Sequence, residues 1–90
     1  MQNDEVEVRI KYLATLREKS GVREECVSFP PGSTLSSVAR WIQDTHGLSV
    51  PSSRIMTILN GRGWGQLSDG IETQLRNGDT ICLFPPISGG

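Results

Sequence analysis

The strictest constraint on the fold is an alternation of apolar and charged residues near the N-terminus. Val6, Val8, Ile10 and Tyr12 are separated from one another by charged side chains. A period of two residues is that of a β-strand with one buried face, because successive side chains of a strand point to opposite sides. The sequence therefore predicts a strand over 5–12, with one face covered by another layer of structure.

The following segment predicts a hairpin and then a helix. A short helical turn is expected over 14–19, and an extended pattern resumes over 23–29, so that two strands form a hairpin. Ser33 or Thr34 is placed to cap a helix, and Gly47 is placed to end it. Apolar residues recur between them at the i, i+3, i+4, i+7 spacing of an amphipathic helix. These residues are Leu35, Val38, Ala39 and Ile42.

The second half predicts two main strands joined by a less regular connection. Residues 55–59 are apolar and β-branched, as in a central strand, and Asn60-Gly61 marks a turn after them. We expect a brief edge strand at Gln66-Leu67 and a short turn or helical segment over 71–75. An Asn-Gly-Asp turn then leads into a last strand over 80–84.

This order of elements fits a small α+β fold in which a mixed sheet packs on one main helix. The arrangement is that of the β-grasp (ubiquitin-like) architecture, with the first and last strands parallel and side by side at the centre of the sheet. We expect residues 1–90 to form a single β-grasp domain. Its flexible C-terminal tail, 85–90, would project from the best-packed part of the fold.

Composition excludes several classes of function. With 90 residues, of which 36% are hydrophobic and 21% charged, one modest core is possible and an enclosed catalytic cavity is not expected. The net charge is −1 and the Lys and Arg residues are scattered, which argues against a nucleic-acid partner. The sequence has neither a run that could span a membrane nor a secretory signal, so we expect a cytoplasmic protein with no membrane partner.

The cysteines, the histidine and one tryptophan are assigned structural roles. Cys26 and Cys82 are too few for a four-thiolate metal site, and each lies in a strand-like run where a thiol packs as a small hydrophobe. A disulfide between them is the less favoured alternative. His46, near the predicted helix end, is expected to interact with the helix dipole rather than to act as a base or metal ligand. Trp64 is either a core anchor or an exposed contact, and we favour the anchor.

The C-terminal segment is suited to deliver a carboxylate. Gly89-Gly90 follows a strand-like run and the stiff segment Pro85-Pro86-Ile87-Ser88. Glycines lack Cβ atoms and can thread a channel too narrow for a side chain, while prolines hold the chain extended. Terminal glycines also occur at frayed ends or in added tags. The direct junction with a strand, without a polar linker, favours a functional tail.

Strand parity predicts that Phe84 lies on the sheet face opposite the core. If Ile81 and Leu83 face the core, Cys82 and Phe84 point to the opposite face. Phe84 would then form part of an apolar patch suited to a partner surface. The alternative, equally supported by the sequence, is that its ring folds against the prolines that follow it.

Taken together, four segments resemble the MoaD-like sulfur carriers, the small subunits of molybdopterin synthase, within the MoaD/ThiS ubiquitin-like family. The most specific segment is the Phe-Pro-Pro-x-x-Gly-Gly ending, because a Gly-Gly terminus alone is shared with ubiquitin and with thiamin-pathway carriers. The resemblance runs nearly the whole chain. Its segments are 8–18, Leu59-Asn60-Gly61, Asn77-Gly78-Asp79 and 83–90.

The resemblance implies a carrier that is not an enzyme by itself and binds no cofactor or metal. A MoeB-like, E1-like adenylating enzyme would use ATP to activate the Gly90 carboxylate, and a sulfur donor would convert it to a thiocarboxylate. A MoaE-like large subunit, in a heterotetramer, would pass this sulfur to a pterin precursor to form the dithiolene of the molybdenum cofactor. Gly89 would provide clearance. The residues expected to bind the partner and steer the tail are Phe84, Pro85, Pro86, Ile87 and Ser88.

Other functions remain open at this point. A ubiquitin-like modifier would share the activation of Gly90 but join it to lysines of other proteins. A sulfur carrier could also serve a thiamin, cysteine or tungsten-cofactor pathway. A passive β-grasp binding module would tolerate loss of the terminal glycines. A stand-alone enzyme is least favoured, because no nucleophile and base pair is evident and Asp69 and Glu72 are typical solvated loop charges.

Overall fold

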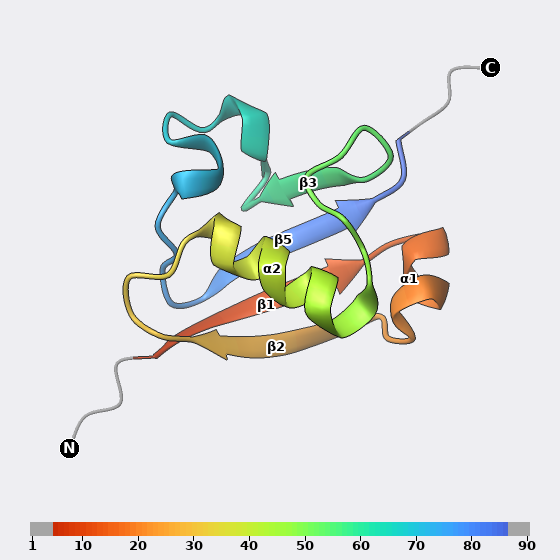
Figure 1. Cartoon of the computed structure of the whole chain (residues 1–90), viewed down its shortest axis with the longest axis horizontal. Coiled ribbons are helices and arrows are strands. Elements are labelled where there is room, and N and C mark those ends of the chain that lie inside the picture. Colours follow the sequence, from red (N-terminus) through yellow and green to blue (C-terminus); the bar gives the residue numbers. More distant parts are fainter. Residues whose placement is uncertain (1–4, 87–90) are drawn as a thin grey trace.

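The computed structural model describes residues 5–86 and contains one five-stranded sheet in the order β2-β1-β5-β3-β4. The main helix, α2, lies across one face of this sheet (Figure 1). The strands and helices are β1 (Val6–Tyr12), α1 (Thr15–Ser20), β2 (Glu24–Phe29), α2 (Leu35–His46), β3 (Met56–Leu59), β4 (Arg62–Gly63) and β5 (Asp79–Phe84). Two short 3-10 turns, η1 (Trp64–Gln66) and η2 (Gly70–Glu72), connect β4 to β5.

The topology confirms the expected mixed β-grasp sheet. β1 pairs in parallel with β5, with Ile10 opposite Ile81, at the centre of the sheet. β1 and β2 form the predicted antiparallel hairpin, and β3 is antiparallel to β5. The carboxyl ends of β1 and β5 therefore lie at the same end of the sheet, which is where the described part of the chain ends (Figure 1).

The core lies between the sheet and α2, and it uses the residues that the periodicity selected. Val8, Ile10 and Tyr12 of β1 are 0% exposed. The predicted helical stripe is also buried, and it comprises Leu35, Val38, Ala39 and Ile42. Burial of one face of each element explains why these elements form here, since the hydrophobic effect stabilises each apolar face only when it is covered. Among residues 5–86, no helix is both long and apolar enough to cross a membrane.

α2 begins after Thr34, one of the two predicted N-cap residues, and ends at Gly47, as predicted. The Thr34 N–H donates a hydrogen bond to Ser37 Oγ over 3.1 Å at the start of the helix. At the other end, Gly47 adopts φ 70°, and its N–H donates to the Gln43 carbonyl over 2.9 Å. This left-handed conformation favours glycine, so the helix ends where a residue without Cβ is available.

The prediction of an edge strand at Gln66-Leu67 is wrong. The edge strand is β4, in which Gly63 lies opposite Ile58 of β3. Gln66 instead ends η1, where its side-chain Oε1 accepts a hydrogen bond from the Gly63 N–H over 3.2 Å. This contact folds the chain back on itself, so Gln66 cannot continue in an extended strand.

Trp64 is a core anchor, as favoured from the sequence. Trp64 is the first residue of η1, directly after β4, and it is only 3% exposed. The short β4 strand therefore ends where the chain turns to bury a large ring. This burial explains why a segment with two flanking glycines holds a defined position.

The two cysteines lie in strands and are free thiols, as expected. The expectation that both pack as small hydrophobes is wrong for Cys26, which is exposed on β2. Cys26 lies opposite Arg9 on the face of the sheet that α2 does not cover. Cys82 is half-buried on the same face of β5.

Candidate partner-binding face and C-terminal segment

Of the predicted site residues, the structure describes Phe84, Pro85 and Pro86. Phe84 ends β5, and Pro85 and Pro86 follow it directly. Pro85 is half-buried and Pro86 is exposed. Ile87, Ser88, Gly89 and Gly90 lie outside the described residues, so the expectations for these four remain predictions.

The end of β5 is held firmly before the tail begins. The Leu83 carbonyl accepts a hydrogen bond from the Leu13 N–H over 2.9 Å, on the β1 side. On the other side, Phe84 lies opposite Met56 of β3. Because β5 has partner strands on both edges, the position and direction of the chain at Pro85 are fixed by the sheet.

The start of β5 is fixed by two turns that also belong to the segments carrying the family resemblance. Asp79, which is 7% exposed, accepts hydrogen bonds from the Asn60 side-chain amide over 2.9 Å and from the Arg76 N–H over 2.8 Å. The Asn60 amide oxygen in turn accepts from the Thr80 N–H over 2.9 Å. A buried carboxylate needs such donors, so the two turns interlock and set the register of β5.

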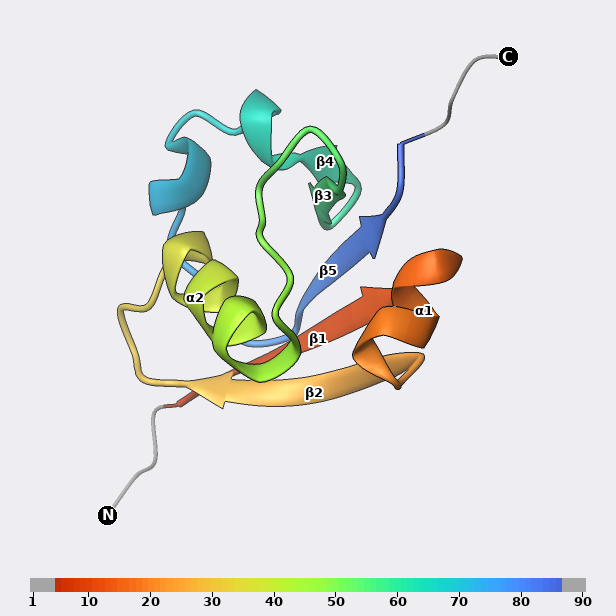
Figure 2. The same cartoon turned by 45° about the vertical axis from the view of Figure 1, so that its right-hand side comes forward.

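The strand-parity prediction is confirmed. Ile81 and Leu83 are 0% exposed, whereas Cys82 and Phe84 are half-buried on the other face. Figure 2 shows α2 on only one side of the sheet, so the opposite face is left uncovered by a helix.

Register adds two apolar residues of β3 to this uncovered face. Phe84 lies opposite Met56, and Cys82 lies opposite Ile58. The resulting β3/β5 patch consists of Met56, Ile58, Cys82 and Phe84, and Met56 is 42% exposed. A group of neighbouring, partly exposed apolar side chains on an uncovered sheet face is suited to binding another protein.

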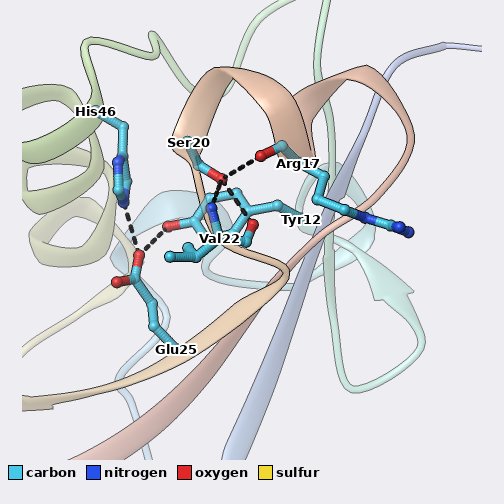
Figure 3. A network of polar contacts seen from close by, with 6 residues as sticks. All are labelled: Tyr12, Arg17, Ser20, Val22, Glu25 and His46. Atoms are coloured by element: carbon cyan, nitrogen blue, oxygen red, sulfur yellow. Dashed lines mark hydrogen bonds and ion pairs between the residues drawn. The ribbon is translucent and has the colours of Figure 1, made fainter.

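A second cluster, which sequence reasoning missed, joins the end of α2 to the hairpin (Figure 3). The Tyr12 hydroxyl donates to Glu25 Oε2 over 2.7 Å, and His46 Nε2 lies 2.7 Å from the same oxygen. The Tyr12 and His46 rings meet edge to face with centroids 5.3 Å apart. Burial, followed by the hydrogen bond to Glu25 and its charge, raises the pKa of Tyr12 well above its usual value of 10.0.

The position of His46 at the last residue of α2 agrees with the sequence expectation, but its main observed partner is Glu25. Its side chain is 11% exposed. Glu25 follows the inward parity of β2, opposite Ile10. A glutamate on an inward strand position was the signal that an interior polar partner had to exist. Within residues 5–86, no group of three His, Cys, Asp or Glu side chains could hold a metal ion.

Replacing Tyr12 with phenylalanine is expected to lower the free energy of unfolding by about 1.5 kcal/mol near neutral pH, because a hydrogen bond to a carboxylate is lost. The raised pKa of Tyr12 means that the folded chain keeps a proton that the unfolded chain releases above pH 10. The wild type therefore loses about 1.4 kcal/mol per pH unit above pH 10, and the variant does not. Urea unfolding at about pH 8 and about pH 11 measures both effects. The prediction would be contradicted if the wild type and the variant differed in free energy of unfolding by the same amount at both pH values.

Comparison with known proteins identifies the family of this chain. Residues 10–90 match the model described as the ThiS family. This chain belongs to the ThiS family. The molybdopterin synthase sulfur carrier subunit of Anopheles gambiae is 30% identical over 89 residues, covering 97% of this chain and 96% of the relative. Small archaeal modifier protein 3 of Haloferax volcanii is 28% identical over 93 residues, covering 94% and 100%.

Solved structures confirm the ubiquitin-like β-grasp fold of this ThiS-family chain. Small archaeal modifier protein 1 of Methanosarcina acetivorans matches with a TM-score of 0.77 and 27% identity, covering 98% of this chain and 100% of that one. A chain of the complex of subunits 1 and 2 of the molybdopterin-converting factor of Helicobacter pylori matches with a TM-score of 0.62 and 24% identity. The match covers 94% of this chain and 100% of that one. The chain is thus a ubiquitin-like carrier of the ThiS/MoaD type.

Proposed function

We propose that this chain is a sulfur carrier for molybdopterin synthesis, in which a terminal thiocarboxylate on Gly90 is the sulfur donor. One structural observation carries the proposal. β5 is paired on both edges at the centre of the sheet, and Pro85 and Pro86 follow it directly. The molybdopterin synthase sulfur carrier subunit of Anopheles gambiae supports this pathway among those open to the family.

The proposed chemistry begins with activation of a poor electrophile. A carboxylate oxygen of Gly90 attacks the α-phosphate of ATP on an E1-like, MoeB-like enzyme, and pyrophosphate leaves. A sulfur donor at the oxidation level of sulfide then delivers HS⁻ to the acyl carbon of the adenylate, AMP leaves, and the thioacid releases its proton. The resulting thiocarboxylate is ionised near neutral pH and is nucleophilic in the manner of a thiolate.

The fold contributes orientation rather than catalytic groups. A segment that leaves a rigid strand through two prolines loses little conformational freedom when it enters a partner's channel. The wild-type sheet therefore lowers the entropic cost of placing a small terminal group in a distant active site. The catalytic residues of the scheme belong to the partners.

We assign the β3/β5 patch to partner binding. In this proposal, a MoaE-like large subunit covers the patch and receives the tail, and two such pairs form a heterotetramer. The assembly of subunits 1 and 2 in the molybdopterin-converting factor of Helicobacter pylori supports a complex of this kind. The half-buried Phe84 and the exposed Met56 are the side chains with most to bury on binding.

Replacing Phe84 with lysine is expected to leave folding intact and to weaken binding of the activating enzyme or the large subunit at least about tenfold. The reason is that Phe84 lies outside the core, whereas a charge in the centre of an apolar interface would be desolvated. Isothermal titration of each partner measures the change. Ser28→Lys is a matched control, because Ser28 is exposed on β2, on the same sheet face but away from the patch. Unchanged affinity for both partners would refute the assignment.

A protein modifier is the second candidate, favoured by the similarity to small archaeal modifier protein 3. The activation step would be the same, but Gly90 would end in an isopeptide bond with a lysine of another protein. Mass spectrometry of trypsin-digested cell extract distinguishes the two products. Lysines bearing a remnant of this chain's C-terminus identify a modifier, and free thiocarboxylate without such lysines identifies a carrier.

The deciding experiment for the proposed function is the intact mass of the chain after incubation with its activating enzyme, ATP and a sulfur donor. We expect a mass increase that corresponds to the exchange of one oxygen for one sulfur. Transfer of that sulfur to the pterin precursor by the large subunit then tests the pathway. A chain that gains no sulfur, with an enzyme shown to be active on another carrier, would overturn the proposal.

A further inference from the structure

A pocket whose wall carries two cations and several hydroxyl groups lies beside the base of the C-terminal segment, and the proposed chemistry does not use it. It has a volume of about 370 Å³ and is lined by residues of α1, of the loop before β3 and by Pro85. Lys19 of α1 and Arg54 of the loop are the two cations in its wall. Figure 2 shows α1 and the loop entering β3 on either side of the carboxyl end of β5.

The charges of this pocket are not neutralised within the described chain. The ion pairs found in residues 5–86 are those of Arg9 with Glu24 and of His46 with Glu25. Lys19 and Arg54 are both exposed and take part in neither pair. Two cations in the wall of one pocket, neither with a carboxylate partner among the described residues, attract an anion.

Two of the hydroxyl groups in the pocket wall already form hydrogen bonds within the chain. Ser49 Oγ donates to the Gln43 side-chain oxygen over 2.8 Å, and Ser52 Oγ accepts from the Arg54 N–H over 3.2 Å. No hydrogen-bond partner within residues 5–86 is found for the Ser53 hydroxyl, which is thus available to a ligand in the pocket. A hydroxyl donor beside two cations is complementary to a carboxylate oxygen.

Basic residues are concentrated at this end of the molecule although the chain carries a net charge of −1. The topology explains the concentration, because the end of β1, α1, the start of β2 and the start of β3 all surround the end of β5. The cations on these elements are Lys11, Arg17, Lys19, Arg23 and Arg54, and the carboxylates are Glu18, Glu24 and Glu25, of which Glu25 is paired with His46. The base of the tail is therefore surrounded by net positive charge.

From this placement, we infer that the Lys19/Arg54 pocket docks an acidic side chain of the protein that activates the tail. The inference rests on the proposed function. A carrier must bind its activating enzyme and leave it in every cycle, and charge contacts at the rim of an interface act mainly on the association rate. A partner side chain held in this pocket would lie next to Pro85, where the tail leaves the sheet.

The test compares pyrophosphate release by the activating enzyme, at increasing concentrations of carrier, for the wild type and for Lys19→Glu/Arg54→Glu. We expect the double variant to raise KM about tenfold or more with kcat unchanged, because steering is lost while the tail is intact. The KM of the wild type should rise with salt concentration, and that of the double variant should not. Lys19→Arg/Arg54→Lys, which keeps both charges, should restore a KM close to that of the wild type.

The control is Arg40→Glu/Arg76→Glu, which makes the same change in net charge away from the tail. Arg40 is exposed on α2 and Arg76 is exposed before the start of β5. Thermal unfolding verifies that both double variants fold, and the control should keep the wild-type KM. An equal rise in KM for the control would overturn the inference, because it would show an effect of net charge alone.

The outcomes also separate this inference from the function on which it rests. Pyrophosphate release that is equal for the wild type and Lys19→Glu/Arg54→Glu overturns only the pocket inference. If, in addition, inorganic phosphate produces saturable NMR shifts at Lys19 and Ser53, the pocket binds a free anion instead of a partner's carboxylate. Absence of any release from the wild type, with an enzyme active on another carrier, overturns the proposed function and the inference together.

Discussion

A chain that lacks Gly90 is expected to gain no sulfur when it is incubated with the activating enzyme, ATP and a sulfur donor. When a tail is threaded through a partner's channel in extended form, removal of one residue withdraws the carboxylate by about 3.5 Å. A displacement of even about 1 Å of a reacting group costs roughly a hundredfold in rate, so the shortened chain should fall below detection. Intact-mass spectrometry over a time course measures the loss directly.

Two further variants separate the length of the tail from its clearance. An alanine added after Gly90 moves the carboxylate in the opposite direction and should also abolish the reaction. Gly90→Ala keeps the length and adds only a Cβ, so it should slow sulfur incorporation without moving the carboxylate along the channel. Incorporation into the shortened chain at the wild-type rate would show that Gly90 is not the reacting residue.

Trp64→Ala is expected to lower the free energy of unfolding by about 3 to 5 kcal/mol, the range for removal of a large buried aromatic ring. Trp64 is 3% exposed and belongs to the core cluster, although it follows an edge strand of only two residues. Small domains have total stabilities of only about 5 to 15 kcal/mol, so the variant would be partly unfolded at moderate urea concentrations. Equilibrium urea unfolding followed by circular dichroism measures the change.

Trp64→Phe is the informative control for this loss. Trp64 Nε1 is buried and has no hydrogen-bond partner among the described residues. A buried N–H without a partner costs about 1 to 3 kcal/mol, and phenylalanine removes that cost together with some ring volume. The phenylalanine variant should therefore lose much less stability than the alanine variant. A loss of under about 1 kcal/mol for Trp64→Ala would contradict its assignment as a core anchor.

The sequence by itself determined the elements that have a strong period. The alternation ending at Tyr12 predicted β1, and the stripe through Val38 and Ile42 predicted α2 and its buried face. These predictions succeed because burial of one face imposes a fixed spacing on the residues of a single element, so the pattern can be seen without knowledge of the rest of the chain. The same rule placed Phe84 opposite the core face of β5.

The tertiary structure alone decided which residues of different elements meet. The register of β3 against β5 placed Met56 beside Phe84 and so formed the patch, and the fold brought Lys19 and Arg54 to one pocket. The edge strand was mislocated because a two-residue strand has no period, and a side-chain contact of Gln66 decided the path. Contacts between residues distant in sequence depend on how whole elements pack, and a local pattern does not specify that packing.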